Sequence, residues 1–443
     1  MELSIDVLAV IYRFLQNDID RLNFRKMCTA TYHFEQVIDR CYTLEQIKKY
    51  PNCTFTHLIT RKPEELHHIP PSIDKISCIH ANLTTLPNLS QLVKLDCIGN
   101  KLTRLPDMPL LVYLCCSNNQ LTQLPNMPRL THLSCSNNQL TQLPNMPLTC
   151  LDCDNNEITQ LPDMPRLAKL YCSGNQLTQL PCMPLLTKLH CYNNQLTQLP
   201  RTQYLRRLTI LWCMRNKLTR LPHMPRLVSL DCGGNQLIQL SDMPRLVSLD
   251  CAYNELTQLP DMPRLTELNC FDNELTQLPC MPRLTKLNCS FNQLIQWPYM
   301  PRLTELDCSL NKITQLPDMP RLTELDCSCN QLTQLPYTPR LTKLSCSDNQ
   351  LTQLPGQCMP RLTSLRCDRN QLTQLPDMPL LTRLDCNSNQ LSQLPYMPLL
   401  TELDCNSNRL SQLPDMPLLI ELCYYNNPIY TTAVYAFIKG YKI

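Results

Sequence analysis

Cysteine is the residue type in this 443-residue chain whose abundance most suggests chemistry, with 28 copies. Cys150 and Cys153 have the C-x-x-C spacing of zinc sites, but an expected strand would turn them to opposite sides. The carboxylates of Glu305 and Asp307 fall among Lys and Thr, as on a solvated face. The chain also lacks the glycine-rich phosphate loop and the nucleophile elbow of common enzymes. We therefore predict no metal, no cofactor and no enzyme activity.

The cysteines belong to a repeat of nineteen residues that runs almost unchanged from Leu95 to Asn427. The unit 265–283 reads LTELNCFDNELTQLPCMPR, and Leu265 is taken here as its first position. Alternation over Leu268–Cys270 predicts a short strand. One unit cannot bury its Leu, Cys and Met side chains alone, so stacked neighbours must complete the core. The pattern predicts a solenoid.

Two columns of the repeat carry polar or reactive side chains that the core must accommodate. Cysteine occupies the sixth position in eighteen units, and there it serves as a small buried hydrophobe. Neighbouring cysteines would lie about 4.8 Å apart, so we predict a reduced ladder, with cross-linked neighbours as the alternative. Asparagine occupies the ninth position in eighteen units. A stack of Asn side chains can form hydrogen bonds with the backbone N–H and C=O groups that lose their sheet partners where each strand ends.

The return segment of each unit ends in the pattern L-P-x-M-P. Proline fixes φ and lacks a backbone donor, so this side of the solenoid is expected to be extended rather than helical. The unit resembles the leucine-rich repeat from about Ile76 to Ile429, and its tail is similar to the L-P-x-L-P of short-repeat bacterial effectors. The repeated sequence QLTQLPDMPRLTELDC also resembles repeat proteins of giant DNA viruses that infect amoebae.

This resemblance implies an α+β solenoid, a horseshoe of about 19 coils with a parallel concave β-sheet and an extended convex side. It also implies binding of a protein target on the concave face. The third and fifth positions face that side, and aromatic and basic residues gather there in the first half of the chain. Our candidate protein-binding residues are Tyr113, His132, Lys169, Tyr171, Lys188, His190, Ile210 and Trp212. Drift among near-identical repeats is the alternative explanation for this gathering.

The first fifty residues differ in kind from the repeats and carry apolar residues at helical spacing. The run LSIDVLAVIYRFL from Leu3, followed by Asp18-Ile19 and Met27-Cys28, resembles an F-box, although Ser4 stands where that family has proline. The resemblance implies docking to a Skp-type linker of a cullin–RING ubiquitin ligase. The implied contacts are Leu3, Ile5, Leu8, Ile11 and Leu15. The alternative is a helical cap over the first coil, in a plain repeat scaffold.

These patterns divide the chain into four parts. We predict an F-box-like helical module at 1–50, a junction with a degenerate first coil at 51–75, the repeat array at 76–429 and a C-terminal cap at 430–443. Net charge is only +3 and no apolar run is long enough to span a bilayer, so neither nucleic acid nor membrane is an expected partner. We expect an intracellular monomer, in the host cytoplasm if the viral resemblance holds.

Overall fold

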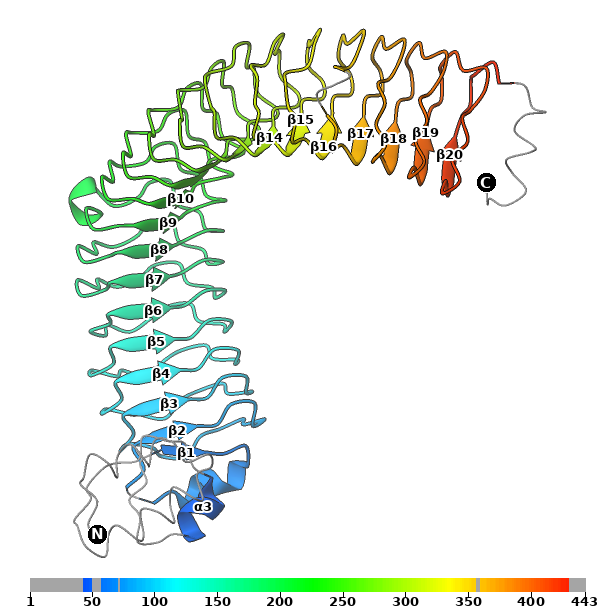
Figure 1. The fold of residues 1–443 in the computed structure, drawn as a ribbon. Helices are drawn as coiled ribbons and strands as arrows, with labels where there is room; N and C mark the ends of the chain where they lie inside the picture. The colour runs from blue at the N-terminus through cyan, green and yellow to red at the C-terminus, as the bar shows by residue number, and fades with distance from the viewer. Residues whose placement is uncertain (1–42, 50–56, 71, 356–358, 430–443) are drawn as a thin grey trace, which may run out of the picture.

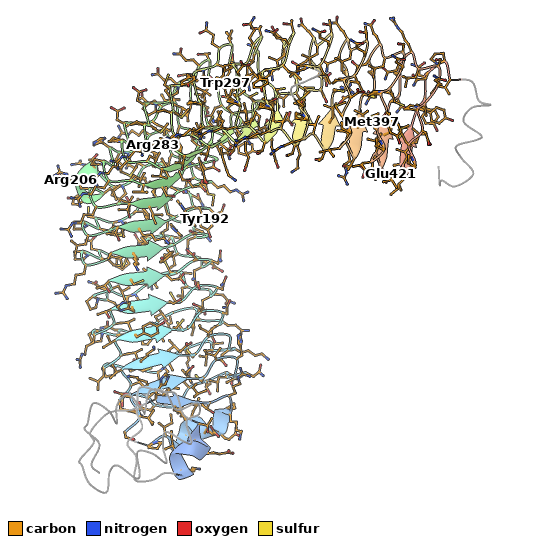
Figure 2. All side chains as sticks on the ribbon, viewed as in Figure 1. Tyr192, Arg206, Arg283, Trp297, Met397 and Glu421 are labelled. Atoms are coloured by element: carbon orange, nitrogen blue, oxygen red, sulfur yellow. The ribbon has the colours of Figure 1, made fainter. Side chains whose placement is uncertain are left out.

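The computed structural model describes residues 43–49, 57–70, 72–355 and 359–429. These residues coil into one solenoid that is bent into an arch, with each coil stacked on the one before it (Figure 1). In Figure 2, Tyr192 marks the turns on the inner side of the arch and Arg206 marks a longer coil on its outer side. Strands β14–β20 run along the inner side.

Each coil contributes one strand of three residues, which pairs in parallel with the strand of the next coil. The described residues form a single sheet of 20 strands. The strands are β1 His57–Ile59, β2 Lys75–Ser77, β3 Lys94–Asp96, β4 Tyr113–Cys115, β5 His132–Ser134, β6 Cys150–Asp152, β7 Lys169–Tyr171, β8 Lys188–His190, β9 Ile210–Trp212, β10 Ser229–Asp231, β11 Ser248–Asp250, β12 Glu267–Asn269, β13 Lys286–Asn288, β14 Glu305–Asp307, β15 Glu324–Asp326, β16 Lys343–Ser345, β17 Ser364–Arg366, β18 Arg383–Asp385, β19 Glu402–Asp404 and β20 Glu421–Cys423.

The core is one continuous column of Leu, Cys and Met side chains that runs the length of the array. The strand lies at Glu267–Asn269 in the unit described above, one residue earlier than predicted. Its central Leu268 is buried and its two neighbours face outward, as period-two alternation requires. The third and fifth positions therefore lie on the face of the sheet opposite the core, where most of their side chains are exposed or half-buried and those of Cys115 and His190 are buried.

The predicted asparagine ladder is confirmed. The side chain of Asn273 donates from Nδ2 to the carbonyl oxygens of Cys251 and Cys270, at 3.0 and 3.2 Å. Its Oδ1 accepts the N–H of Leu256 in the preceding coil, at 3.0 Å. Buried backbone groups at the end of each strand are thereby paired, which avoids a cost of about 1–3 kcal/mol for each unpaired group.

The residue that precedes each ladder asparagine adopts the left-handed backbone conformation. Its φ is 57° for Asn118 and 53° for Asp272, for example. Asn, Asp and Gly reach this region at least cost, and most coils carry such small or polar residues here. This turn changes the direction of the chain after the strand. It thereby places the asparagine side chain within hydrogen-bond distance of the backbone at the end of the strand.

The cysteine column is buried, and the described cysteines form no disulfide. Cys270 is fully buried beside Cys251 and Cys289, and burial raises its thiol pKa. Cys153 is buried whereas Cys150 lies half-exposed on the sheet surface, so the C-x-x-C pair points to opposite sides as predicted. Buried neutral thiols act here as small apolar groups.

Helix is scarce in the described residues. One α-helix, α3 Leu44–Lys49, precedes the sheet, and two short 3₁₀ segments occur at Pro63–His68 and Thr202–Tyr204. The described array is therefore a solenoid of parallel strands whose return side is almost free of helix, and the predicted α+β class is not supported. The residues that carry the predicted F-box-like module and C-terminal cap lie outside the described ranges, apart from α3. None of the described helices has the length and apolarity that a bilayer span requires.

Candidate protein-binding surface

The eight candidate residues Tyr113, His132, Lys169, Tyr171, Lys188, His190, Ile210 and Trp212 are called the aromatic patch below. They lie on strands β4, β5, β7, β8 and β9. Tyr113 and His132 are register partners in the column of third positions. Tyr171, His190 and Trp212 are successive register partners in the column of fifth positions. The parallel register thus brings residues separated by about twenty positions into contact.

The first group of the patch is centred on Tyr113. Its ring stacks on that of His132 with centroids 6.2 Å apart. The ammonium group of Lys94, from the preceding strand, lies 4.6 Å from the centre of the Tyr113 ring. Thr131 Oγ1 lies 2.9 Å from His132 Nδ1 and orients the imidazole. A cation over an aromatic face contributes about 0.5–1 kcal/mol at an exposed site.

The second group is a tighter stack of three rings. The His190 and Trp212 rings are nearly parallel, with centroids 4.0 Å apart. Tyr171 meets His190 edge-on at 4.9 Å. The ammonium group of Lys188 lies 5.2 Å from the Tyr171 ring centre and 5.8 Å from that of Trp212. One lysine therefore holds both outer rings of the stack in place.

Strand β6 separates the two groups with smaller side chains, Cys150 and Asp152. Asp152 accepts a hydrogen bond from Ser134 Oγ at 3.0 Å. Lys169 is the register partner of both Cys150 and Lys188, and it is exposed. The patch thus consists of two aromatic groups joined by a strip that carries the carboxylate of Asp152 and the exposed side chain of Lys169.

His190 lies beneath the surface rather than on it, with 6% of its area exposed. Its Nε2 atom is buried and has no hydrogen-bond partner among the described groups. Loss of solvent, and secondarily the charge of Lys188, lowers the pKa of His190 to about 4. The imidazole is therefore neutral at physiological pH and supports the Trp212 ring as a flat, uncharged base. Trp212 itself is 37% exposed.

A half-buried carboxyl lies in the turn that follows β6. Asp154 accepts a hydrogen bond from the Ser173 N–H, and burial raises its pKa to about 6. This group was not among the sequence candidates, and neither was Lys94, which supports Tyr113. Lys94 occupies the same third position as Tyr113 and could have been found from the column, whereas burial of Asp154 depends on how the turns stack. Among the described residues, no three His, Cys, Asp or Glu side chains are grouped so as to hold a metal.

The arrangement presents groups that suit binding. Trp and Tyr present large apolar faces with a polar edge, and such residues dominate the energetics of protein interfaces. Three lysines, Lys94, Lys169 and Lys188, add positive charge along the same strip. A protein surface with apolar and acidic groups would complement it.

Comparisons with known proteins agree with this fold. The family model "Leucine Rich repeats (2 copies)" matches residues 109–147, 301–338 and 339–380. The chain is similar to the solved structure of YopM from Yersinia enterocolitica WA-314, at 36% identity and a TM-score of 0.77, over 82% of this chain and 84% of that one. The comparison with curated proteins gives no match.

Two further solved structures are informative. The functional domain of InlJ from Listeria monocytogenes, which includes a cysteine ladder, is 29% identical with a TM-score of 0.56, over 68% of this chain and 69% of that one. The Arabidopsis receptor kinase HAESA, solved with the peptide hormone IDA and the co-receptor SERK1, is 22% identical with a TM-score of 0.58, over 81% and 79% of the two chains, and shows the fold alone. From its similarity to YopM over most of both chains, this protein belongs to the leucine-rich-repeat family, whose fold is typical of protein–protein interaction.

Proposed function

We propose that this chain is a non-enzymatic scaffold that binds a protein partner on the concave face of its repeats, with the aromatic patch as the main contact. The observation that carries this proposal is the stack in which Trp212 lies 4.0 Å from a buried, neutral His190. A tryptophan on a strand surface exposes apolar area without adding to the core. A rigid, exposed tryptophan is the kind of residue that anchors a partner.

The stack favours binding because it is already ordered in the free chain. Lys188 contacts the Tyr171 and Trp212 rings, so their side chains lose less freedom when a partner covers them. Truncation of such an anchor typically costs 2 kcal/mol or more, which corresponds to about thirtyfold in affinity.

The test is recovery of partner proteins from a host-cell lysate on the immobilised full-length chain. The double variant Trp212→Ala/Tyr171→Ala is expected to recover at least tenfold less of the specific partners at unchanged thermal stability. Trp297→Leu is the matched control, because it removes the chain's other tryptophan and restores the leucine that most coils carry at that position. Equal recovery by the wild type and the double variant, with both folded, would refute the proposal.

We further infer the division of the chain into an F-box-like module at 1–50, a junction at 51–75, the array at 76–429 and a cap at 430–443. In this proposal the module joins the array to a Skp-type linker and a cullin, so that the concave face selects a target for ubiquitination. The support is the pattern of Leu3, Ile5, Leu8, Ile11 and Leu15. An intracellular setting, such as the host cytoplasm, belongs to the same proposal, because reducing conditions keep the many thiols unpaired.

This second proposal is tested by titrating the full-length chain with a purified Skp-type linker protein. Saturable binding that is lost in Leu8→Asp and kept in Leu110→Asp would support the adaptor role. Leu110 is a suitable control because it is an exposed leucine within the array. Absence of binding would leave the alternative, a scaffold whose first helices only cover the first coil.

A further inference from the structure

Among four consecutive coils, three place a bulky side chain at the left-handed position that follows the strand. Tyr253, Phe291 and Leu310 occupy the left-handed position before the ladder asparagine, with φ of 54°, 56° and 55°. Bulky L-residues are strained in this region, where most other coils carry Asn, Asp, Ser, Gly or Arg. The second of the four coils has Asp272 at that position, which tolerates the conformation, and carries Phe271 immediately before it. The strain is thus repeated in one place along the array.

Four side chains on successive coils are called the apolar edge below: Tyr253, Phe271, Phe291 and Leu310. The Tyr253 and Phe271 rings meet at 5.0 Å and the Phe271 and Phe291 rings at 6.1 Å. Tyr253 is 59% exposed, Phe291 50% and Leu310 45%, so the edge adds little to the core. Contiguous exposed apolar area that is also strained has no structural benefit, and such patches mark interaction sites.

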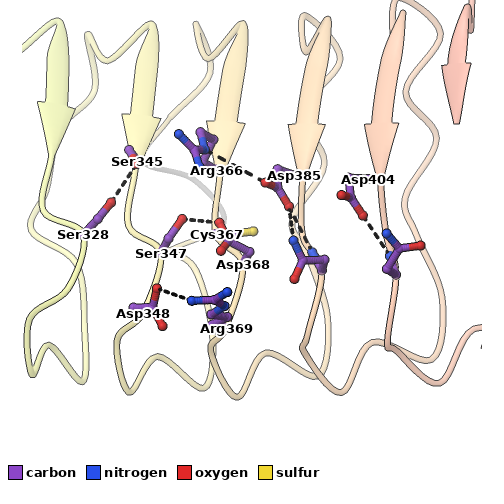
Figure 3. Close-up of polar contacts among 12 residues, drawn as sticks. Ser328, Ser345, Ser347, Asp348, Arg366, Cys367, Asp368, Arg369, Asp385 and Asp404 are labelled. Atoms are coloured by element: carbon purple, nitrogen blue, oxygen red, sulfur yellow. Dashed lines mark hydrogen bonds and ion pairs between the residues drawn. The ribbon is translucent and has the colours of Figure 1, made fainter. Parts of the chain in front are cut away.

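Other coils of the same array show that the fold does not require apolar side chains at these positions. Figure 3 shows the same edge of the solenoid farther along, where Ser347 and Asp368 occupy the position of Phe271 and hydrogen-bond to each other. Asp348 and Arg369, at the left-handed position, form an ion pair at 3.4 Å. The fold therefore forms with polar side chains at both positions, and nothing in the backbone demands aromatic ones.

An acidic groove lies on the sheet beside the apolar edge. It has a volume of about 640 Å³ and is lined by strands β11–β17. Its three basic residues are paired: Lys286 with Glu305 at 2.9 Å, Lys343 with Glu324 at 2.8 Å, and Arg366 with Asp385 at 4.0 Å. The lining carboxylates without such an ion pair among the described residues are Asp250, Glu267, Asp307 and Asp326.

The turns of the first two coils of the apolar edge are acidic as well. Glu255, Asp272 and Glu274 lie on the same two coils as Tyr253 and Phe271, and Lys312, two residues after Leu310, is the nearest base in sequence. The apolar edge is therefore bordered by negative charge on the sheet and, along its first two coils, in the turns. This is opposite in sign to the aromatic patch, which gathers Lys94, Lys169 and Lys188.

We propose that the apolar edge and the acidic groove form a second docking surface, which takes a basic polypeptide segment that carries apolar side chains. The apolar side chains would cover the exposed rings of Tyr253 and Phe291. Lysine or arginine side chains of the same segment would reach the carboxylates of the groove. Charge complementarity excludes nucleic acid and acidic protein surfaces from this site. The site is separate from the aromatic patch and does not rest on the function proposed for it.

The decisive variant replaces each residue of the apolar edge by one that other coils carry at the same position: Tyr253→Asn, Phe271→Ser, Phe291→Asn and Leu310→Asn together. The probes are three pools of 14-residue peptides with randomised order. The first pool contains Lys and Arg with Phe and Leu, the second replaces the bases by Glu, and the third replaces the apolar residues by Ser. Retention on the immobilised full-length chain is measured for each pool.

The wild type is expected to retain the basic apolar pool at least tenfold more than either other pool. The fourfold variant is expected to lose that difference while its melting temperature stays equal or rises, because asparagine tolerates the left-handed conformation. The control variant Leu380→Asn/Leu399→Asn/Leu418→Asn removes exposed leucines elsewhere and is expected to retain the pool.

Four results would overturn the assignment. The first is equal retention of the acidic and basic pools, and the second is retention of the basic apolar pool unaffected by the fourfold variant. The third is a lower melting temperature of that variant, which would give the edge a structural role. The fourth is a dimer in sedimentation that dissociates in the fourfold variant, which would make a second copy of this chain the occupant.

Discussion

The asparagine ladder makes a prediction whose size follows from its hydrogen bonds. Replacing Asn273 by Ala removes the acceptor of the buried Leu256 N–H and the donor to the carbonyl oxygens of Cys251 and Cys270, and it also ends a longer contact of 3.3 Å to the Phe271 carbonyl oxygen. The two carbonyls keep a second donor, since Cys251 still accepts from Asn254 and Cys270 from Asn292. The Leu256 N–H loses its ladder partner entirely.

The expected loss of stability combines these unequal parts. Leaving a buried donor unpaired costs about 1–3 kcal/mol, and losing one of two bonds at each carbonyl adds about 0.5 kcal/mol apiece. Asn273→Ala is therefore expected to lower the local free energy of unfolding by about 2–4 kcal/mol. Because repeats contact only their neighbours, the effect should be confined to the coils on either side.

Amide hydrogen exchange measures this local free energy directly. Exchange at the Leu256 amide is expected to accelerate by a factor of about 30 or more, which corresponds to 2 kcal/mol. The exposed Gln277 lies in the same coil, and Gln277→Ala should leave exchange unchanged. An effect of Asn273→Ala below about 0.5 kcal/mol, or one spread evenly along the array, would refute this account of the ladder.

Two further predictions concern pKa values. His190 has its pKa lowered from 6.5 to about 4, so the unfolded chain binds a proton first and the wild type should lose stability, relative to His190→Gln, as pH falls from 6.5 towards 4. Asp154, whose pKa is raised to about 6, has the opposite effect on stability as pH falls. It is present in both the wild type and the His190→Gln variant, so its contribution cancels in the difference between their free energies of unfolding. A difference that does not change with pH would contradict the buried position of the imidazole. Exposed Cys182 and Cys280 should react with iodoacetamide in the native chain, whereas Cys270, whose pKa is raised by burial, should react only after unfolding, as peptide mapping of the alkylated sites would show. Labelling of Cys270 at native rates would contradict the closed core.

The regular part of this fold could be predicted from the sequence because the same nineteen-residue pattern of apolar and polar residues recurs in almost every coil. Once Leu268 faces the core, alternation and stacking determine which columns are buried and which face outward. The asparagine ladder follows for the same reason, since Asn273 is the polar residue that recurs where each strand ends. Prolines such as Pro279 indicate the extended return side.

The contacts within the aromatic patch could not be predicted in the same way. The coil between β8 and β9 is longer than the others, with a 3₁₀ turn at Thr202–Tyr204, and only the observed register shows that Trp212 still faces His190. Burial of His190 depends on the rings on both sides of it. The sequence placed it in a surface column, whereas the structure places it beneath Trp212.

The apolar edge was missed for a different reason. Period and hydropathy do not reveal backbone strain, so Tyr253 and Phe291 looked like ordinary variation at a variable position. Their significance appears only when the left-handed φ of that position and the exposure of the rings are both known. In a repeat protein, positions that depart from what neighbouring coils tolerate are the most informative about function.

The central claim, that the aromatic patch is the main contact for a protein partner, is tested most directly by hydrogen exchange on the full-length chain with and without a captured partner. Our account predicts that protection on binding is greatest in strands β4–β9, around Tyr113, Tyr171 and Trp212. Protection confined to the return side of the coils, or absent from these strands in a saturated complex, would contradict it.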